Sequence, residues 1–279
     1  DADRVGAAVK NNEGEWVLLN GNQTALMFVY YLITRWKELG KINGKEYIVK
    51  TIVTTETIKT IAERNGVEMY DVYTGFKWIA NVMRENEGKK NYIGGGEESY
   101  GFLCEDFVRD KDAVSACVIL AEIAAWAKDQ GLSLYQLLQK IYVEYGFSKE
   151  KGISVVKKGK SGAEEIEAMM KKFRENPLTE IAGSKVTYFY DYSTLKGKDY
   201  AENETVTLDM PTTSNVLQYF TEDNTKVSIR PSGTEPKIKF YCEVHSKVKN
   251  IDELPEAEKA AEEKINQIRI YSGEKYEMV

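Results

Sequence analysis

The sequence predicts an α/β fold: a mixed, mainly parallel sheet domain with helices on both faces, followed by a smaller α+β domain with an antiparallel sheet. Over the first half of the chain, short β-branched runs alternate with helical periodicity, which implies crossover connections and parallel strands. The second half is rich in strands with period-two alternation and ends in a helix. A length of 279 residues favours two domains.

The first domain opens with a helix from Thr24 to Leu39, whose apolar side chains share one broad face and which Gly40 follows as a left-handed cap. The elements expected after it are a strand over 47–53, a helix that ends before Gly66, a strand over 67–72, a helix opening at 75–79, a strand at 92–93, a buried helix over 113–127, and a helix from a capping box at Ser133 to Tyr145. In such sheets, ligands bind at the carboxyl ends of the strands.

A shift toward Lys, Ser and Gly between Phe147 and Gly162 marks the domain boundary, which we place after residue 155. We interpret Ser161 to Glu164 as a capping box that starts a helix. The strands expected beyond it cover 185–190, 205–210, 216–220, 227–230 and 238–245, and a final helix starts near Pro255.

Composition excludes several classes of protein. With 38 basic and 44 acidic residues the net charge is −6 and the pI about 5.2, which argues against a nucleic-acid or anionic-membrane binder. The single His245 excludes His-rich metal sites, and three cysteines without a CxxC pair fit the reducing cytosol. The apolar run over 113–127 is shorter than the ~20 residues of a membrane helix. Because the chain opens without Met or an export segment, we expect it to be cut from a longer protein.

The first candidate loop is Asp1-Ala2-Asp3-Arg4-Val5-Gly6. Alternate carboxylates in a turn can converge on a hard divalent cation, and an adjacent Arg can reach a phosphate that the cation also touches. An EF-hand is excluded, because Val5 and Asn12 stand where that loop needs an oxygen donor and a bidentate Glu. Two surface aspartates are also ordinary turn formers, so the pattern alone leaves both interpretations open.

The second candidate loop runs from Gly94 to Gly101 with the sequence GGGEESYG. Glycines let the backbone turn sharply and approach a ligand, while Glu97 and Ser99 could point the same way toward a polyol. A tight turn with incidental charge is the alternative. The loop lacks a GxGxxG register, which disfavours a dinucleotide site.

The third candidate loop, Arg230 to Pro236, joins two alternating strands with the sequence RPSGTEP. An Arg fork, the hydroxyls of Ser232 and Thr234 and the backbone amides around Gly233 together suit a phosphate. Lys237 and Lys239 strengthen this interpretation. A plain Pro-Gly hairpin loop is the alternative.

Two lysines complete the candidates. Lys50 lies in the predicted strand 47–53, and Lys77 follows the next strand in the sequence TGFKW. Cations near the carboxyl ends of parallel strands can meet phosphate oxygens or shuttle a proton. Each lysine taken alone is usually just solvated.

Taken together and in this order, DADR, TGFKW, GGGEESYG, RDKD (Arg109 to Asp112) and RPSGTEPKIK resemble the motifs of the α-D-phosphohexomutase superfamily. The resemblance runs almost end to end. It implies a four-domain parent, with residues 1–20 the tail of a truncated domain carrying part of the metal loop, 21–155 a sugar-binding domain and 156–279 a phosphate-binding domain.

The resemblance also implies roles for individual residues. Asp1 and Asp3 match two of three Mg²⁺ ligands, and Arg4, Lys50 and Lys77 match cations near the transferring phosphoryl group. Sugar hydroxyls would be gripped by Glu97 and Ser99. The nonreacting phosphate would be held by Arg230, Ser232, Gly233 and Thr234.

The activity implied is the interconversion of hexose 1-phosphate and hexose 6-phosphate through a phosphoserine and a bisphosphate, in the cytoplasm. Since the sequence contains no SHNP-like segment, we expect the serine to lie in missing N-terminal domains of the same chain and the fragment alone to be inactive. The partners expected are those domains and a hexose phosphate, with no nucleic acid and no membrane. Glucose is the preferred sugar, while mannose or pentose phosphates and a noncatalytic phosphosugar-binding module remain alternatives.

Overall fold

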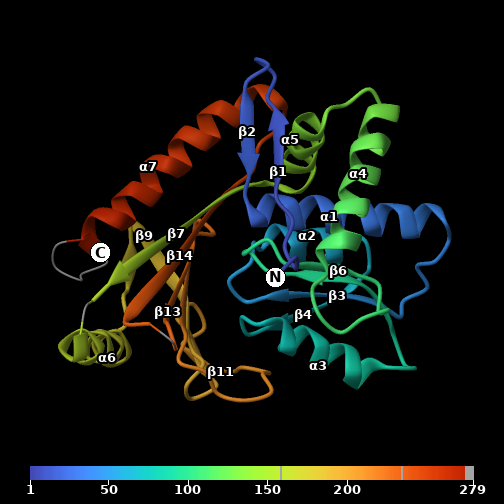
Figure 1. The fold of residues 1–279 in the computed structure, drawn as a ribbon. Helices are drawn as coiled ribbons and strands as arrows, with labels where there is room; N and C mark the ends of the chain where they lie inside the picture. Colours follow the sequence, from blue (N-terminus) through green and yellow to red (C-terminus); the bar gives the residue numbers. More distant parts are fainter. Residues whose placement is uncertain (158, 234, 274–279) are drawn as a thin grey trace. The chain divides into compact units, whose positions relative to one another are not determined.

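The computed structural model describes residues 1–157, 159–233 and 235–273, and it divides into two compact units (Figure 1). The first unit comprises Asp1–Gly146 with Lys247–Ile251, and the second comprises Phe147–Ser246 with the segment from Asp252 onward. The division after Gly146 comes earlier than the boundary predicted after residue 155. It does so because residues 147–156 form a strand of the second unit's sheet.

The first unit is built on a mixed, mainly parallel sheet, as predicted, and this sheet has four strands. In sheet order its strands are β4 (Glu68–Val72), β3 (Glu46–Thr51), β5 (Asn91–Gly96) and β6 (Phe102–Cys104). The first three are parallel and β6 is antiparallel to β5. Its helices are α1 (Gly21–Glu38), α2 (Thr57–Arg64), α3 (Phe76–Asn86), α4 (Ala113–Asp129) and α5 (Leu134–Tyr145). Helices α1 and α3 cover opposite faces of the sheet (Figure 1).

Side-chain alternation in β3 explains how this sheet is covered on both faces. Tyr47 and Val49 lie in a buried cluster with Phe76 and Ile79 of α3. Ile48 and Lys50 point to the other face, and both are buried. Helix α1 begins earlier than predicted, at Gly21, because the side chains of Asn20 and Gln23 form a reciprocal capping box.

The three consecutive glycines belong to β5 and not to a turn, which corrects the interpretation drawn from the sequence. A Cβ on Gly95 would lie 2.4 Å from the carbonyl oxygen of Val49 and 2.7 Å from the hydroxyl of Tyr92. A Cβ on Gly96 would lie 2.7 Å from the carbonyl oxygen of Gly101. These glycines therefore allow close packing between neighbouring strands.

Helix α4 is where the prediction of a fully buried helix is wrong. Ala116 and Ile123 are buried, but Val114 is 70% and Val118 is 61% exposed. Composition alone cannot distinguish the two faces, because the helix is apolar nearly all round. Within the described part of the chain, no helix combines the length and apolarity needed to cross a bilayer.

The second unit is an antiparallel sheet with helices, as predicted. In sheet order its strands are β11 (Glu204–Thr207), β10 (Lys196–Asp199), β9 (Ser184–Asp191), β12 (Leu217–Thr221), β13 (Lys226–Pro231), β14 (Lys237–Ser246) and β7 (Phe147–Val156), with β8 (Glu180–Ile181) paired to β9. The predicted period-two face of β14 is confirmed, since Ile238, Phe240, Cys242 and Val244 are all buried.

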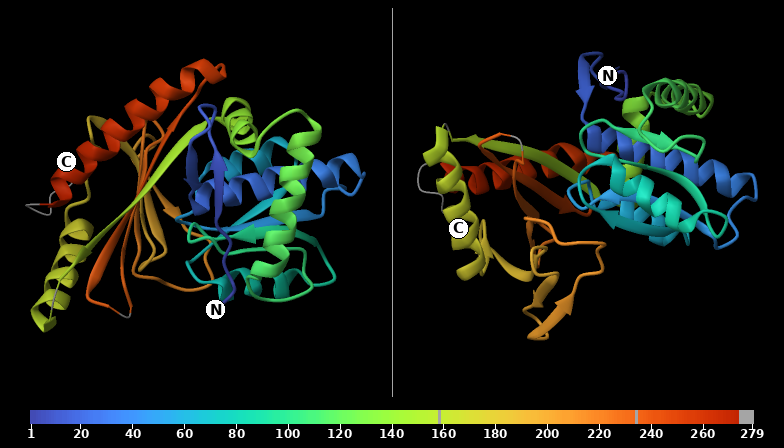
Figure 2. Two further views of the ribbon diagram at one scale, coloured as in Figure 1. Left: turned by 45° about the horizontal axis from the view of Figure 1, so that its top comes forward. Right: turned by 60° about the horizontal axis from the view of Figure 1, so that its bottom comes forward.

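Two helices complete the second unit. Helix α7 (Leu254–Gly273) contacts β7 and β14, along which it runs in Figure 2. Helix α6 (Gly159–Glu175) contains Ser161 in its first turn, so the predicted capping box is wrong.

The first unit also carries a two-stranded hairpin of β1 (Ala7–Lys10) and β2 (Trp16–Leu19).

The three thiols are expected to differ sharply in reactivity. Burial raises the pKa of Cys242 to about 12 and raises the pKa of Cys104, whereas Cys117 is exposed on α4. Thiolate is the reactive species. Under native conditions at neutral pH we therefore expect a disulfide reagent such as DTNB to modify Cys117 alone, and a Cys117→Ser variant to stay unmodified until denaturant is added. Rapid modification of three thiols in the native protein would contradict the burial of Cys104 and Cys242.

Candidate functional site

Four segments that are far apart in the sequence meet at one end of the first unit's sheet. They are residues 1–6, 74–78, 94–101 and 109–112, and they include the predicted metal and sugar loops. The contacts that join them are two hydrogen bonds donated by backbone N–H groups, one ion pair, and one contact between an ammonium group and an aromatic ring. Elements around the carboxyl ends of β4 and β5 thus bring the predicted residues into one neighbourhood.

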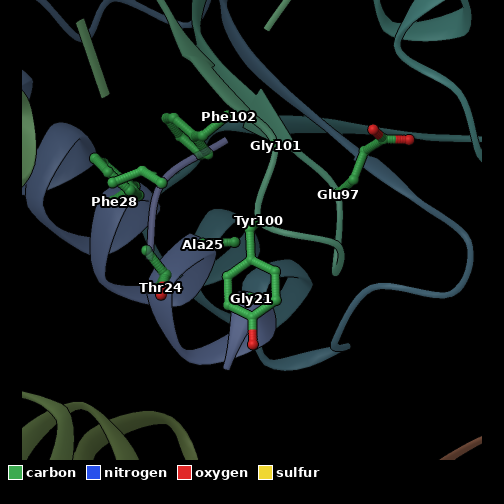
Figure 3. Close-up of a pocket in the computed structure, with 9 residues that line it drawn as sticks. Gly21, Thr24, Ala25, Phe28, Glu97, Tyr100, Gly101 and Phe102 are labelled. Atoms are coloured by element: carbon green, nitrogen blue, oxygen red, sulfur yellow. The ribbon is translucent and has the colours of Figure 1, made fainter. Parts of the chain in front are cut away.

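Glu97 is the buried carboxylate of this site, at 5% exposure. It directly follows β5, and its Oε1 accepts the N–H of Gly75 at 2.8 Å, which joins the TGFKW segment to the 97–101 loop. Its own N–H donates to the carbonyl of Gly101 at 2.9 Å. In Figure 3, the side chains of Glu97 and Tyr100 point away from each other on either side of the turn.

The start of the chain docks on the same loop. The N–H of Val5 donates to the carbonyl of Tyr100 at 3.1 Å, and the carboxylate of Asp3 pairs with Lys111 at 3.0 Å. Asp1 and Arg4 are exposed. The predicted metal loop and the predicted sugar loop are therefore held together by direct contacts.

Lys111 is a site residue that sequence analysis misses. Its ammonium pairs with Asp3 and lies 5.9 Å from the ring of Phe76, and its side chain would lie 2.7 Å from a Cβ on Gly101. Lys111 belongs to the segment 109–112, and it therefore contacts each of the other three segments. The signal is present in the RDKD motif, but the motif does not show which of its charges points inward.

The Lys111 pair has a measurable consequence at Asp3. The hydrogen bond from Lys111 lowers the pKa of Asp3 below its ordinary value of 3.8. We expect Lys111→Gln to raise that pKa toward the ordinary value, measured by NMR titration of the Asp3 carboxyl carbon. Arg109→Gln in the same segment, which pairs with Glu87, should leave the pKa of Asp3 unchanged. An unchanged titration in Lys111→Gln would show that the pair does not form in solution.

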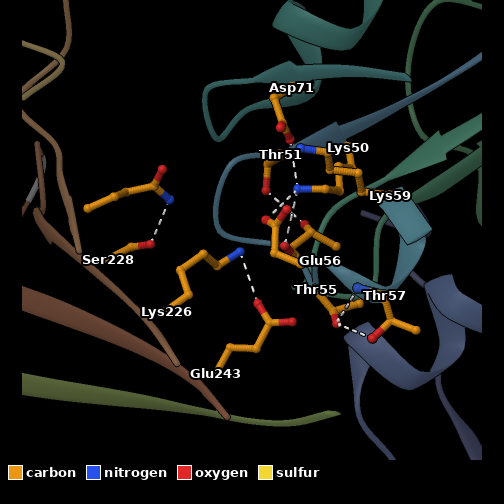
Figure 4. A network of polar contacts seen from close by, with 12 residues as sticks. Lys50, Thr51, Thr55, Glu56, Thr57, Lys59, Asp71, Lys226, Ser228 and Glu243 are labelled. Atoms are coloured by element: carbon orange, nitrogen blue, oxygen red, sulfur yellow. Dashed lines mark hydrogen bonds and ion pairs between the residues drawn. The ribbon is translucent and has the colours of Figure 1, made fainter. Parts of the chain in front are cut away.

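The two predicted lysines differ in their surroundings. Lys77 is exposed, with its ammonium 5.0 Å from the centre of the Trp78 ring. Lys50 is 1% exposed, and its ammonium lies 2.7 Å from Asp71 and 3.0 Å from Glu56 (Figure 4). This geometry does not support a contact between Lys50 and a phosphate, because two carboxylates already share its charge.

The described residues do not make a complete Mg²⁺ site. Across residues 1–157, 159–233 and 235–273, no group of three or more His, Cys, Asp or Glu side chains could hold a metal. Asp3 is already paired with Lys111. A divalent cation such as Mg²⁺ needs more oxygen ligands than two carboxylates supply. Asp1 and Asp3 can therefore hold such a cation only together with further oxygen ligands.

The second unit holds the predicted phosphate loop between β13 and β14. Arg230 lies in β13 directly opposite Lys239 of β14, which places two cations across one antiparallel pair. Like charges in this register repel, and a bound anion would relieve the repulsion. The N–H of Ser232 donates to the carbonyl of Lys237 at 2.8 Å, and Gly233 is exposed. Thr234 lies outside the described residues.

Two family models match the chain. Residues 20–145 match "Phosphoglucomutase/phosphomannomutase, alpha/beta/alpha domain III", and residues 154–261 match "Phosphoglucomutase/phosphomannomutase, C-terminal domain".

Among curated proteins, the chain is 37% identical over 254 residues to a phosphoglucomutase of Staphylococcus aureus, covering 91% of this chain and 45% of the relative. It is 33% identical over 245 residues to a phosphoglucomutase of Staphylococcus haemolyticus, covering 88% of this chain and 44% of the relative. The chain thus spans less than half the length of these relatives.

Solved structures show the same fold at low identity. A putative phosphomannomutase from Thermus thermophilus aligns with a TM-score of 0.58 at 18% identity, covering 95% of this chain and 43% of that one. The phosphoglucomutase parafusin from Paramecium aligns with a TM-score of 0.56 at 17% identity, covering 95% and 44%. The matched motifs, the two units and these comparisons agree: the chain belongs to the alpha-D-phosphohexomutase superfamily and corresponds to its third and C-terminal domains.

Proposed function

We propose that this chain is the sugar- and phosphate-binding part of a phosphohexomutase that interconverts hexose 1-phosphate and hexose 6-phosphate, with glucose phosphate as the substrate. The convergence of residues 1–6, 74–78, 94–101 and 109–112 in the first unit carries the proposal. Relatives named phosphoglucomutase support it. In this proposal the first unit recognises sugar hydroxyls and the second unit binds a phosphate group.

Each group has a chemical task in this proposal. The carboxylate of Glu97 accepts hydrogen bonds from sugar hydroxyls, and its burial strengthens these bonds. The hydroxyl of Ser99 donates to a sugar oxygen or accepts from a sugar hydroxyl. Arg230 with Ser232, Gly233 and Thr234 binds the nonreacting phosphate through charge-assisted hydrogen bonds. Arg4 and Lys77, both exposed cations, stabilise negative charge on the transferring phosphoryl group.

Two parts of the reaction would come from outside the described residues. We propose that the phosphoserine donor and the remaining Mg²⁺ donors lie in other domains of a longer protein, which acts in the cytosol, where the free thiols of this chain would stay reduced. The chain of 279 residues alone is then expected to show no conversion of glucose 1-phosphate into glucose 6-phosphate in a coupled dehydrogenase assay. Turnover by this chain alone would contradict the assignment of the donor.

Isothermal titration calorimetry tests the binding function directly. We expect the chain to bind glucose 6-phosphate and Arg230→Ala to weaken that binding by about tenfold or more, because each lost charge-assisted hydrogen bond is worth roughly 1.5–3 kcal/mol. Arg84→Ala, which removes an exposed arginine from α3, is the matched control and should bind like the wild type. Preference for ATP or NAD over the sugar phosphate would overturn the proposal in favour of a nucleotide-binding protein.

A further inference from the structure

The ammonium group of Lys50 is buried near the carboxyl end of β3, beside the turn that follows this strand. Lysine is almost never fully buried without partners. Here Asp71 of β4 and Glu56 of the turn supply the counter-charges, and the ammonium also donates to the carbonyl of Thr54 at 3.4 Å. Lys50 therefore holds the backbone of this turn in place through its contacts with Thr54 and Glu56.

Thr54 connects this turn to the 97–101 loop by a hydrogen bond. Its side chain is fully buried, and its hydroxyl accepts the N–H of Glu98 at 3.2 Å. The hydroxyls of Thr54 and Thr51 lie 2.8 Å apart, and Thr51 donates to Oε2 of Glu98 at 3.3 Å. The last residue of β3 and the turn after it thus hold both the carboxylate and the backbone of Glu98.

Helix α1 confines Glu98 at a second point. A Cβ on Gly21 would lie 1.9 Å from the carbonyl oxygen of Glu98 and 2.7 Å from the N–H nitrogen of Tyr100. The hollow that Gly21, Phe28, Tyr100 and Phe102 line in Figure 3 has no room for a sugar. Glu98, which lies between Glu97 and Ser99 in the sequence, is therefore held in place from two sides, by the end of β3 with its turn and by α1.

We propose that Lys50, Thr54 and Glu98 form a positioning relay that presets Glu97 and Ser99 for one configuration of sugar hydroxyls. The inference rests on the proposed hexose phosphate function and adds the source of its specificity. A site that is held rigidly rejects a ligand with one misplaced hydroxyl, whereas a loosened loop adapts to it. Thr54 and Glu98 are positioning residues in this relay and set the discrimination between glucose and mannose phosphates.

Hydrogen exchange of the 279-residue chain tests the relay without any ligand. In Thr54→Val, which keeps the side-chain volume but removes the hydroxyl, we expect the amides of residues 97–101 to exchange about tenfold faster. Thr54→Ser restores a hydroxyl and should restore slow exchange. Thr60→Val in α2 is the control for a threonine outside the relay and should match the wild type. Unchanged exchange in Thr54→Val would overturn the proposal.

Calorimetry with two sugar esters tests the specificity. We expect the ratio of the dissociation constants for mannose 6-phosphate and glucose 6-phosphate to fall by about fivefold in Thr54→Val, since one neutral hydrogen bond is at stake. Affinity for inorganic phosphate should stay unchanged, and Thr54→Ser should recover the ratio. An unchanged ratio despite a loosened loop would overturn the specificity role. If the wild type binds inorganic phosphate and neither ester more tightly, the proposed function fails, while the exchange experiment still decides the relay.

Discussion

Replacing Gly95 with alanine is expected to destabilise the first unit by about 3 kcal/mol, near the upper end of ordinary overpacking costs. The new Cβ would lie 2.4 Å from the carbonyl oxygen of Val49, and a backbone atom inside a sheet cannot move away without breaking strand pairing. All four tryptophans (Trp16, Trp36, Trp78 and Trp126) lie in the first unit, so urea unfolding followed by tryptophan fluorescence reports on this unit alone.

Gly6→Ala provides the control for this experiment. Gly6 belongs to the same unit, and a Cβ there would meet nothing within 4 Å. We expect its unfolding midpoint to stay close to that of the wild type. Equal midpoints for Gly95→Ala and Gly6→Ala would show that β5 does not pack against β3 as closely as described.

The second large effect is expected at the buried ion pair of the second unit. Lys226 and Glu243 are 3.0 Å apart and face each other across β13 and β14, with side chains only 3% and 4% exposed (Figure 4). Removing one partner leaves an uncompensated buried charge, so Lys226→Met should cost about 3–5 kcal/mol. Replacing both partners, as in Lys226→Met with Glu243→Leu, should recover most of that loss.

Hydrogen exchange of the amides in β13 and β14 measures this effect within the second unit, which tryptophan fluorescence does not report. The single variant should exchange much faster than the wild type in these strands, and the double variant should approach the wild type. A double variant as unstable as the single one would show that the pair also serves contacts that apolar side chains cannot replace.

Much of the fold could be predicted because local patterns agree with the tertiary structure. The apolar face of β14 follows period two, and a reciprocal capping box starts α5 at Ser133, as predicted. Strand β7 is missed because Lys149 to Lys151 interrupt any apolar pattern. The strand forms without an apolar pattern because it pairs with β14 over its full length. The ion pairs of Lys149 and Lys151 with Glu262 also stabilise it.

Part of the candidate site could also be predicted, because its residue types are chemically distinctive. A buried lysine is the counterexample. Lys50 has the same type and position as a ligand-binding cation, and only the fold shows that Asp71 from the neighbouring strand and Glu56 from the next turn share its charge. Lys111 shows the reverse, since its partner Asp3 is more than a hundred positions away in the sequence. Long-range ion pairs of this kind leave no local signal.

The proposed function requires residues of both units to respond to the same hexose phosphate. Hydrogen exchange during a titration with glucose 6-phosphate measures this response in each unit. We predict that the amides of Glu97 to Gly101 and those of Ser232 and Gly233 become more protected at the same ligand concentration. Inorganic phosphate should protect only the latter two, and Arg230→Ala should shift the protection of both segments to about tenfold higher ligand concentration or beyond. If glucose 6-phosphate protects only one of the two segments, or protects them at clearly different concentrations, the proposed function is wrong.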